Sequence, residues 1–270
     1  MRRHRIRLPE PATWGRKQLL TLLAGTVVAA VLLLFGLGLS VYYTLRSADP
    51  PNTTTSEAVS DPYDALAARP MPTASVEAAR PGPLTTRPFR SLTLPSGRQL
   101  GPAGVTTGFP PTAEGALAQL VALDQAVLQS ASVPEAQRLI RAWARRGGPT
   151  PTTWSGVRAV AEMLSAAEVP ASGSPSFTVS ATPELGLVKG TVGSRYVVAC
   201  VNFVVTATGV RTARVAAADC QRMVWVRDDR GVWRWMIGPG SEPAQPPSVW
   251  PGTEVAHRAG YLRLGFEDDQ

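Results

Sequence analysis

A stretch of 28 residues without a charged side chain, residues 18–45, constrains the fold of this chain more than any other feature. About 20 apolar residues are enough to cross the hydrocarbon core of a bilayer. Tyr42 and Tyr43 lie near the end of the stretch, where interfacial aromatic residues are common. The stretch therefore predicts a transmembrane helix over residues 18–45. A cleaved signal peptide is the alternative, although its apolar region would be shorter, about 7–15 residues, and followed by small residues.

The tail before this segment holds most of the net positive charge. Residues 1–17 carry six basic side chains against Glu10, so that the remaining residues contribute only +2 to the net charge of +7. Basic residues beside a first membrane span favour the cytoplasmic side. We therefore expect a cytoplasmic tail, residues 1–17, and an extracytoplasmic location for the chain beyond residue 45. A nearly neutral body does not indicate direct binding of nucleic acid.

Residues 46–105 have the composition of a linker. Twelve of the 25 prolines lie between residues 46 and 112, among many Ser, Thr and Ala residues. Such a segment buries too little apolar surface to offset its ordering entropy, which predicts a disordered, extended tether rather than a recognition segment. Its last part, from Arg87 on, contains spaced apolar residues. Packing of that part on the following domain stays open.

Residues 106–265 predict an α+β domain. Thr112 is a plausible N-cap for a first helix, a second opens with a capping box at Ser132 and stops at Gly147-Gly148, and a third spans residues 154–167. β-Branched, alternating segments joined by short turns follow from residue 177 to 237, with one turn expected at Pro183-Glu184. This order predicts three helices packed on a curved antiparallel sheet. By analogy it matches the cone of the nuclear-transport-factor-2-like fold.

The two cysteines of the chain, Cys200 and Cys220, bracket a predicted hairpin. Val210 is the midpoint between them, so an odd-numbered turn around Gly209 places the two residues opposite each other. Opposed residues are close enough for a disulfide, and an extracytoplasmic compartment is oxidising. We predict a cross-strand disulfide, with two buried free thiols as the alternative. A metal site is not expected, because the only histidines are His4 and His257.

No phosphate-binding loop, nucleophile elbow or zinc-protease motif is present in the sequence. The sequence therefore predicts no catalytic residue, no metal and no cofactor. Asp124 is the one carboxylate in an unusual position, because it interrupts the apolar stripe of the first helix. A pocket that holds Asp124 beside Tyr196 could support proton transfer. The alternative is that Asp124 bonds a neighbouring Arg or hydroxyl.

Several short segments carry a family resemblance: GVTTGFPPTAEGALAQL, LVKG, YVVACVNF, DCQRMVW, WRWMIGPG and PSVWPGTEVAHRAGY. Over about residues 85–265 the chain resembles actinobacterial membrane proteins of integrative conjugative elements. More distantly, its layout is similar to the bitopic scaffold proteins of type IV secretion and conjugation systems. The resemblance implies a non-enzymatic scaffold that contacts other transfer or secretion proteins. A homo-oligomer stays open as a further kind of contact.

Two other classes of function remain open at this point. The first is an extracytoplasmic enzyme or ligand-binding sensor built on a pocket at Asp124 and Tyr196. The second is a cell-envelope protein that binds wall polymer. The near-neutral external domain and the missing catalytic motifs favour the scaffold.

Overall fold

The computed structural model describes residues 61–267. The basic tail, the predicted transmembrane helix and residues 46–60 lie outside the described residues. Among residues 61–267, no helix is both long and apolar enough to cross a bilayer. The described part of the chain folds as an α+β domain.

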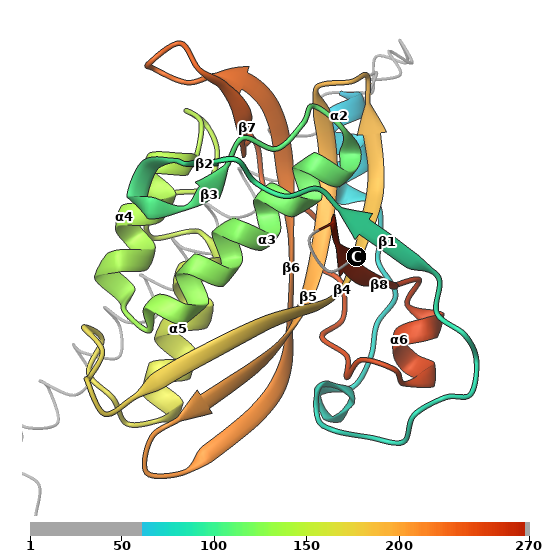
Figure 1. The fold of residues 1–270 in the computed structure, drawn as a ribbon, viewed down its shortest axis with the longest axis vertical. Coiled ribbons are helices and arrows are strands. Elements are labelled where there is room, and N and C mark those ends of the chain that lie inside the picture. The colour runs from blue at the N-terminus through green and yellow to red at the C-terminus, as the bar shows by residue number, and fades with distance from the viewer. Residues whose placement is uncertain (1–60, 268–270) are drawn as a thin grey trace, which may run out of the picture. The chain divides into compact units, whose positions relative to one another are not determined.

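The domain is organised around a six-stranded sheet with the strand order β1-β8-β4-β5-β6-β7 (Figure 1). The strands are β1 (Ser91–Leu94), β4 (Thr178–Val192), β5 (Tyr196–Thr208), β6 (Thr212–Arg227), β7 (Trp233–Ile237) and β8 (Leu262–Phe266). The antiparallel meander β4–β7 confirms the sequence prediction. The sheet as a whole is mixed, because β1 pairs with β8 in parallel. Neither of these two strands was predicted.

Strand β4 is continuous through the turn that was expected at Pro183-Glu184. Its pairing with β5 shifts register between Pro183 and Leu185 and again between Val188 and Gly190. Such irregularities bend a strand and increase its twist. The turn signal in the sequence therefore marks a bend within one long strand, which explains why the prediction of two short strands was wrong.

Three helices cover one face of the sheet, as the sequence predicted: α3 (Ala113–Ser130), α4 (Val133–Trp143) and α5 (Ser155–Ala166). The Thr112 side chain caps α3 by accepting a hydrogen bond of 3.0 Å from Gly115 N. The apolar side chains of the three helices meet alternate residues of β5 in one core, including Val197, Ala199, Val201 and Phe203.

Two details of α4 differ from the prediction. Ser132 makes no side-chain capping bond, and Glu135 pairs with Arg138 instead. The helix ends at Trp143, before Gly147, because the next two residues bond to the end of β7: Ala144 bridges Ile237, and Arg145 N donates to Ile237 O at 2.8 Å. Tertiary pairing thus stops the helix earlier than the glycine signal indicates.

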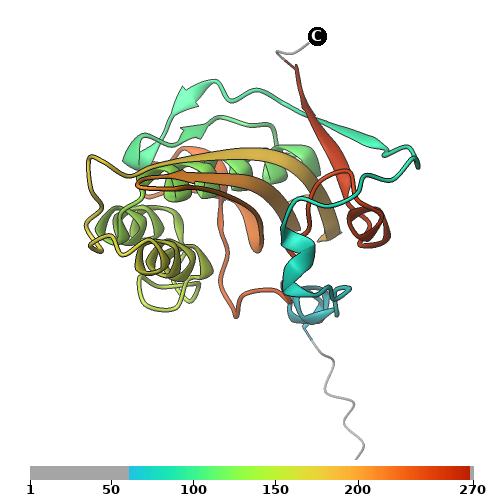
Figure 2. The same cartoon turned by 90° about the horizontal axis from the view of Figure 1, so that it is seen from below.

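The other face of the sheet is covered by two short helices, α2 (Pro62–Ala68) and α6 (Glu254–Arg258), and by the chain between β7 and α6. In both views α2 and α6 lie at the opposite end of the sheet from α4 and α5 (Figure 2). Residues 241–249 follow the edge of β6 beyond the end of β7. There Gln245 Oε1 accepts from Cys220 N, and Ser248 Oγ accepts from Ala218 N, both at 3.0 Å. Side chains thus satisfy an edge that no strand covers.

The prediction of a disordered linker is wrong for residues 61–86, and the part from Arg87 on, which the sequence left open, packs on the domain. Besides α2 and β1, this segment forms the short elements η1 (Val76–Ala79), β2 (Gln99–Leu100), η2 (Pro102–Gly104) and, just after it, β3 (Thr106–Thr107). Leu66 and Leu94 are buried, and the buried Lys189 Nζ donates to Ala67 O at the end of α2, at 2.8 Å. A cation at a helix C-terminus is favourable. A few apolar residues are enough to order this segment, because each one packs against the surface of the sheet or of the helices.

Gly115 gives the first testable prediction. In an isolated helix, Gly to Ala gains about 1 kcal/mol. Here a Cβ atom on Gly115 would overlap the carbonyl oxygen of Pro110, which accepts a hydrogen bond of 2.8 Å from Trp235 Nε1. We therefore expect Gly115→Ala to lower the free energy of unfolding by about 1–3 kcal/mol.

Chemical denaturation measures this effect, with Gly265→Ala as the matched control. The space around Gly265 is open, with no heavy atom within 4 Å of an added Cβ. Its substitution should change stability by less than about 0.5 kcal/mol. A stabilising Gly115→Ala would show that helix propensity outweighs the overlap and that the prediction is wrong.

Candidate functional site

The two residues of the predicted pocket, Asp124 and Tyr196, lie on opposite faces of the sheet. Tyr196 packs with Leu66, Ala67 and Val198 on the face that α2 covers. Asp124 is on α3, which packs on the other face. The cavity at Asp124 is lined without Tyr196. The structure therefore does not bring these residues together. The odd-numbered residues of β5 face α3, whereas the even-numbered ones, Tyr196 among them, point to the opposite face of the sheet.

Tyr196 has a packing role in this structure. Its hydroxyl donates to Tyr63 O at 3.1 Å, and the two rings meet edge to face with centroids 4.7 Å apart. Burial, the largest cause, raises the pKa of Tyr196, and the neighbouring Arg222 opposes the change. These contacts fasten α2 to the sheet.

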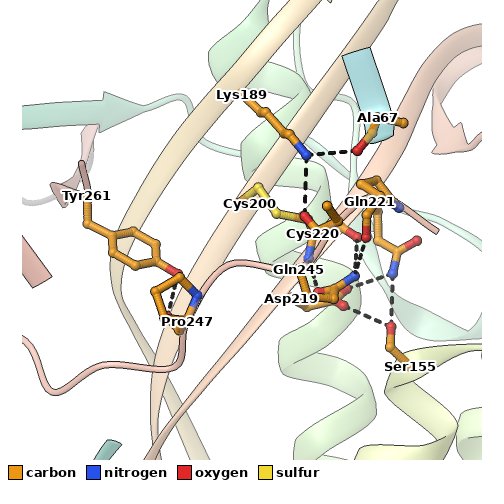
Figure 3. The surroundings of a disulfide bond; sticks show 12 residues. Ala67, Ser155, Lys189, Cys200, Asp219, Cys220, Gln221, Gln245, Pro247 and Tyr261 are labelled. Carbon is orange, nitrogen blue, oxygen red and sulfur yellow. Dashed lines mark hydrogen bonds between the residues drawn. A yellow bond between two sulfur atoms is a disulfide. The ribbon is translucent and has the colours of Figure 1, made fainter. Parts of the chain in front are cut away.

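The disulfide between Cys200 and Cys220 confirms the sequence prediction (Figure 3). The two residues are direct partners in the β5–β6 register, with Cα atoms 4.1 Å apart. The side chain of Gln245 hydrogen-bonds both backbone groups of Cys220: its Oε1 accepts from Cys220 N and its Nε2 donates to Cys220 O. These two groups therefore point away from β5. Cys220 thus belongs to a non-hydrogen-bonded pair with Cys200, the closer kind of pair. Both cysteines are fully buried.

On the helix-covered face, a polar cluster joins β6, α5 and the chain after β7. Ser155 Oγ lies 2.8 Å from both Asp219 Oδ1 and Glu242 Oε1. Gln221 Nε2 donates to Asp219 Oδ2 at 2.8 Å and to Ser155 Oγ at 3.0 Å (Figure 3). Glu242 also accepts from Ser155 N at 2.7 Å, and so caps the start of α5 where the N-cap residue Trp154 cannot.

Asp124 approaches this cluster from α3. Its side chain is buried, and Oδ2 has no hydrogen-bond partner among the described residues. Burial, the largest cause, raises the pKa of Asp124 well above its usual value, and the nearby charges of Asp219 and Glu242 raise it further. The Asp219 carboxyl behaves similarly: burial raises its pKa from 3.8 to about 7, against the lowering effect of its hydrogen bonds. The two carboxyls therefore bind protons more tightly than ordinary aspartates.

A cavity of about 60 Å³ separates the elements that carry these carboxyls. Its lining combines Asp124, Ser155 and Asp219 with apolar or small side chains from α3, α5, β5 and β6. Within residues 61–267 there is no group of three or more His, Cys, Asp and Glu side chains suited to hold a metal ion. The cavity is thus lined by two carboxyl groups with raised pKa values and otherwise mainly by apolar side chains.

Sequence reasoning identified Asp124 but missed its companions. Asp219, Gln221 and Ser155 are distant in sequence from Asp124, and Glu242 lies in a Pro-rich segment. One signal was present: Asp219 and Gln221 alternate with Cys220 on a strand that otherwise carries apolar residues on its core face. Polar residues at two successive inward positions indicate a buried polar site.

A second feature is an exposed patch on the β6–β7 hairpin and the adjoining β4–β5 turn. We call it the tryptophan–arginine patch, and it consists of Arg195, Trp225, Arg227, Val232 and Trp233. The Trp225 and Trp233 rings are stacked, with centroids 6.2 Å apart. The guanidinium carbons of Arg195 and Arg227 lie 4.9 and 5.4 Å from the centroid of Trp233. Trp233 is 38% exposed, and Val232 is 40% exposed. Neither arginine forms an ion pair with any described carboxylate.

Trp233 and Trp235 are two positions apart on β7, so their side chains point to the same face of the sheet. The structure divides their roles. Trp235 is buried, with Nε1 donating to Pro110 O, whereas Trp233 reaches the solvent. A row of aromatic residues thus runs from the core to the surface along β7.

Comparisons with protein-family models, with curated proteins and with solved structures give no match to this chain.

Proposed function

We propose that this protein is a membrane-anchored, non-enzymatic scaffold of a conjugative transfer or type IV-like secretion apparatus. Residues 18–45 anchor it as a single span, residues 1–17 remain in the cytoplasm, and the folded domain lies outside the membrane. The uncharged segment, the basic tail that precedes it and the family resemblance support this arrangement. The chain works by protein–protein contacts, with other transfer proteins and with further copies of itself.

The fold is compatible with this class of scaffold. Three helices, α3 to α5, pack on one face of the antiparallel strands β4 to β7. This arrangement supports a cone of the nuclear-transport-factor-2-like type, to which α2, α6 and the β1–β8 pair add further layers. The buried disulfide supports an oxidising, extracytoplasmic location for the domain.

The tryptophan–arginine patch is the observation that carries the proposal. Trp and Arg are enriched in the energetic centres of protein interfaces. Here they lie together on the surface, stacked and partly exposed, with two guanidinium groups that lack a described carboxylate partner. Charge complementarity therefore indicates an acidic surface on the partner, which surrounds an apolar contact with Trp233.

The test is affinity purification of the full-length tagged protein from detergent-solubilised donor membranes, with quantitative mass spectrometry. We expect transfer or secretion components to co-purify with the wild type. A variant with Trp233→Ala and Arg227→Glu should lose at least about tenfold of that recovery, because hot-spot residues contribute about 2 kcal/mol or more. DNA transfer from the donor should fall with it.

Val210→Ala is the matched control, since Val210 is a fully exposed apolar residue at the tip of the β5–β6 hairpin. It should leave recovery unchanged. Recovery of the wild-type protein alone, or equal recovery with both variants, would overturn the proposal. Retention on purified cell-wall material without any transfer component would instead identify a polymer-binding protein.

A further inference from the structure

We propose that the cavity between α3, α5 and β6 binds a small primary alkylammonium group, with the Asp124 carboxylate as its main partner. This site is separate from the tryptophan–arginine patch and does not depend on the scaffold function. Its basis is the position of one unpartnered buried oxygen in a space that reaches the surface.

The unpartnered oxygen is Asp124 Oδ2. The residue is 4% exposed, and a buried carboxyl oxygen without a hydrogen bond destabilises the folded protein. Asp124 lines the cavity, so a donor placed there can satisfy it. An ammonium guest supplies N–H donors to this oxygen, and its positive charge opposes the rise in the pKa of Asp124, so that the carboxyl is ionised in the complex.

The charge around the cavity selects a cation. Asp219 lines the same space, and Glu242 acts electrostatically on both aspartates. None of the described residues that line the cavity is a lysine, arginine or histidine. Two carboxyl groups thus line the cavity and the charge of a third acts on them, without a basic side chain in the lining, an arrangement that favours a positively charged guest.

The remaining lining selects an organic cation over a metal ion. Val127, Leu128 and Phe203 contribute apolar surface opposite the carboxyls. Two carboxylates and one hydroxyl supply fewer oxygens than the 6–8 that Ca²⁺ takes. An alkylammonium group fits both the acidic and the apolar part of the lining, because its N–H groups donate to the carboxylates and its methylene groups contact the apolar side chains.

The size of the space limits the guest. A volume of about 60 Å³ accommodates roughly two water-sized groups, since the share of one water is about 30 Å³. The ammonium group and the first methylene of propylammonium fit this space, and the rest of its chain extends toward the surface. The cavity reaches the surface at small residues, because Gly156 and Ala159 on α5 and Ala217 on β6 line it and are partly exposed.

Saturation-transfer NMR on the full-length, detergent-solubilised protein tests the site, with propylammonium as the probe. We expect saturation of the probe's methyl protons by the wild type at pH 8. Asp124→Asn, which keeps the side-chain shape and removes the charge, should weaken binding at least about tenfold. Glu162→Gln is the control, because Glu162 is an exposed carboxylate on α5, a helix that lines the cavity, but it is not itself part of the lining. It should bind like the wild type.

Two measurements on the wild type alone keep the test independent of how the variant folds. 1-Propanol has nearly the same shape as propylammonium but no charge, so it should bind at least about tenfold more weakly. Binding should also weaken about tenfold from pH 8 to pH 6. The reason is that the Asp219 carboxyl, with a pKa of about 7, takes up a proton in this range while the ammonium stays charged. Asp124, Glu242 and Tyr261 are the other titratable groups that interact with it.

Equal saturation with wild type, Asp124→Asn and Glu162→Gln would place the probe elsewhere and overturn the proposal. Binding of 1-propanol as strong as that of propylammonium would also overturn the proposal, because it would show that the positive charge does not contribute to binding. A further arm uses N-acetyl-lysine amide. If it binds as well as propylammonium, the natural guest is a lysine side chain of a partner protein; if it is excluded, the guest is a free amine.

Discussion

Replacement of Asp228 by alanine is expected to lower the free energy of unfolding by about 3–5 kcal/mol, the cost of leaving a buried charge without its partner. Asp228 Oδ2 lies 2.7 Å from Arg234 Nη2, and the two side chains are only 9% and 8% exposed. Arg234 has no other ion pair among the described residues, and its Nε and Nη1 atoms already lack hydrogen-bond partners. Removal of Asp228 therefore strands a guanidinium group in the interior.

Asp228 also shapes the β6–β7 hairpin. Its Oδ1 accepts hydrogen bonds from Arg230 N at 3.0 Å and from Val232 N at 2.9 Å. Asp228→Asn retains an acceptor for these turn bonds and removes the charge, so its cost should be smaller than that of alanine. The difference between the two variants separates the turn from the ion pair.

The matched control for Asp228→Ala is Asp229→Ala, one residue along the chain. Asp229 is fully exposed and lies 3.7 Å from Arg145, a surface ion pair that contributes about 0–1 kcal/mol. Urea denaturation followed by fluorescence measures both. Equal costs for the two variants would contradict the structure, because they would place Asp228 in solvent. Introduction of Arg234→Met into Asp228→Ala should recover most of the loss, since it removes the unpaired charge.

Loss of the disulfide is the second large effect that we expect. The bridge closes a loop with a sequence separation of 20 residues, for which the entropy of the unfolded chain predicts about 3 kcal/mol. The double variant Cys200→Ala with Cys220→Ala should lose this amount, and somewhat more from the buried volume that it removes. Substitution of both residues avoids leaving a free thiol.

Reduction of the wild type provides the control for that variant. Under denaturing, non-reducing conditions a thiol count should find no free thiol, since the chain holds only these two cysteines. A reductant should lower the unfolding midpoint of the wild type and leave that of the double variant unchanged. Two free thiols in the untreated protein, or a wild type whose midpoint is insensitive after full reduction, would be incompatible with the bridge.

The extent of sequence-based prediction differs between parts of the domain. The helices α3 to α5 and the strands β5 to β7 follow from local patterns, because amphipathic spacing and short turns act within about 20 residues. The register of β5 and β6 also followed, since the position of Gly209 between two cysteines restricts the turn. For the same reason, the disulfide could be predicted from the sequence.

Residues 61–105 illustrate where local patterns fail. Their composition is that of a disordered segment, yet Leu66, Ala67 and Leu94 are buried. The decisive contacts come from residues far along the chain: Lys189 and Tyr196 hold α2, and β1 pairs with β8 at the C-terminal end. Composition measures how much apolar surface a segment can bury by itself, and it contains no information on a surface that another segment offers.

The sequence by itself determined the charge-free segment and the basic tail that predict a membrane anchor, the order of helices before strands, and the pairing of Cys200 with Cys220. Only the tertiary structure decided that Asp124 faces Asp219 rather than Tyr196, that Asp228 is a buried counter-ion rather than a surface turn residue, and that Gly115 has no space for a methyl group. The physical reason is one of range. Propensity, periodicity and turn chemistry act between neighbours in the chain, whereas burial and charge pairing depend on which distant residues a face of the sheet brings together.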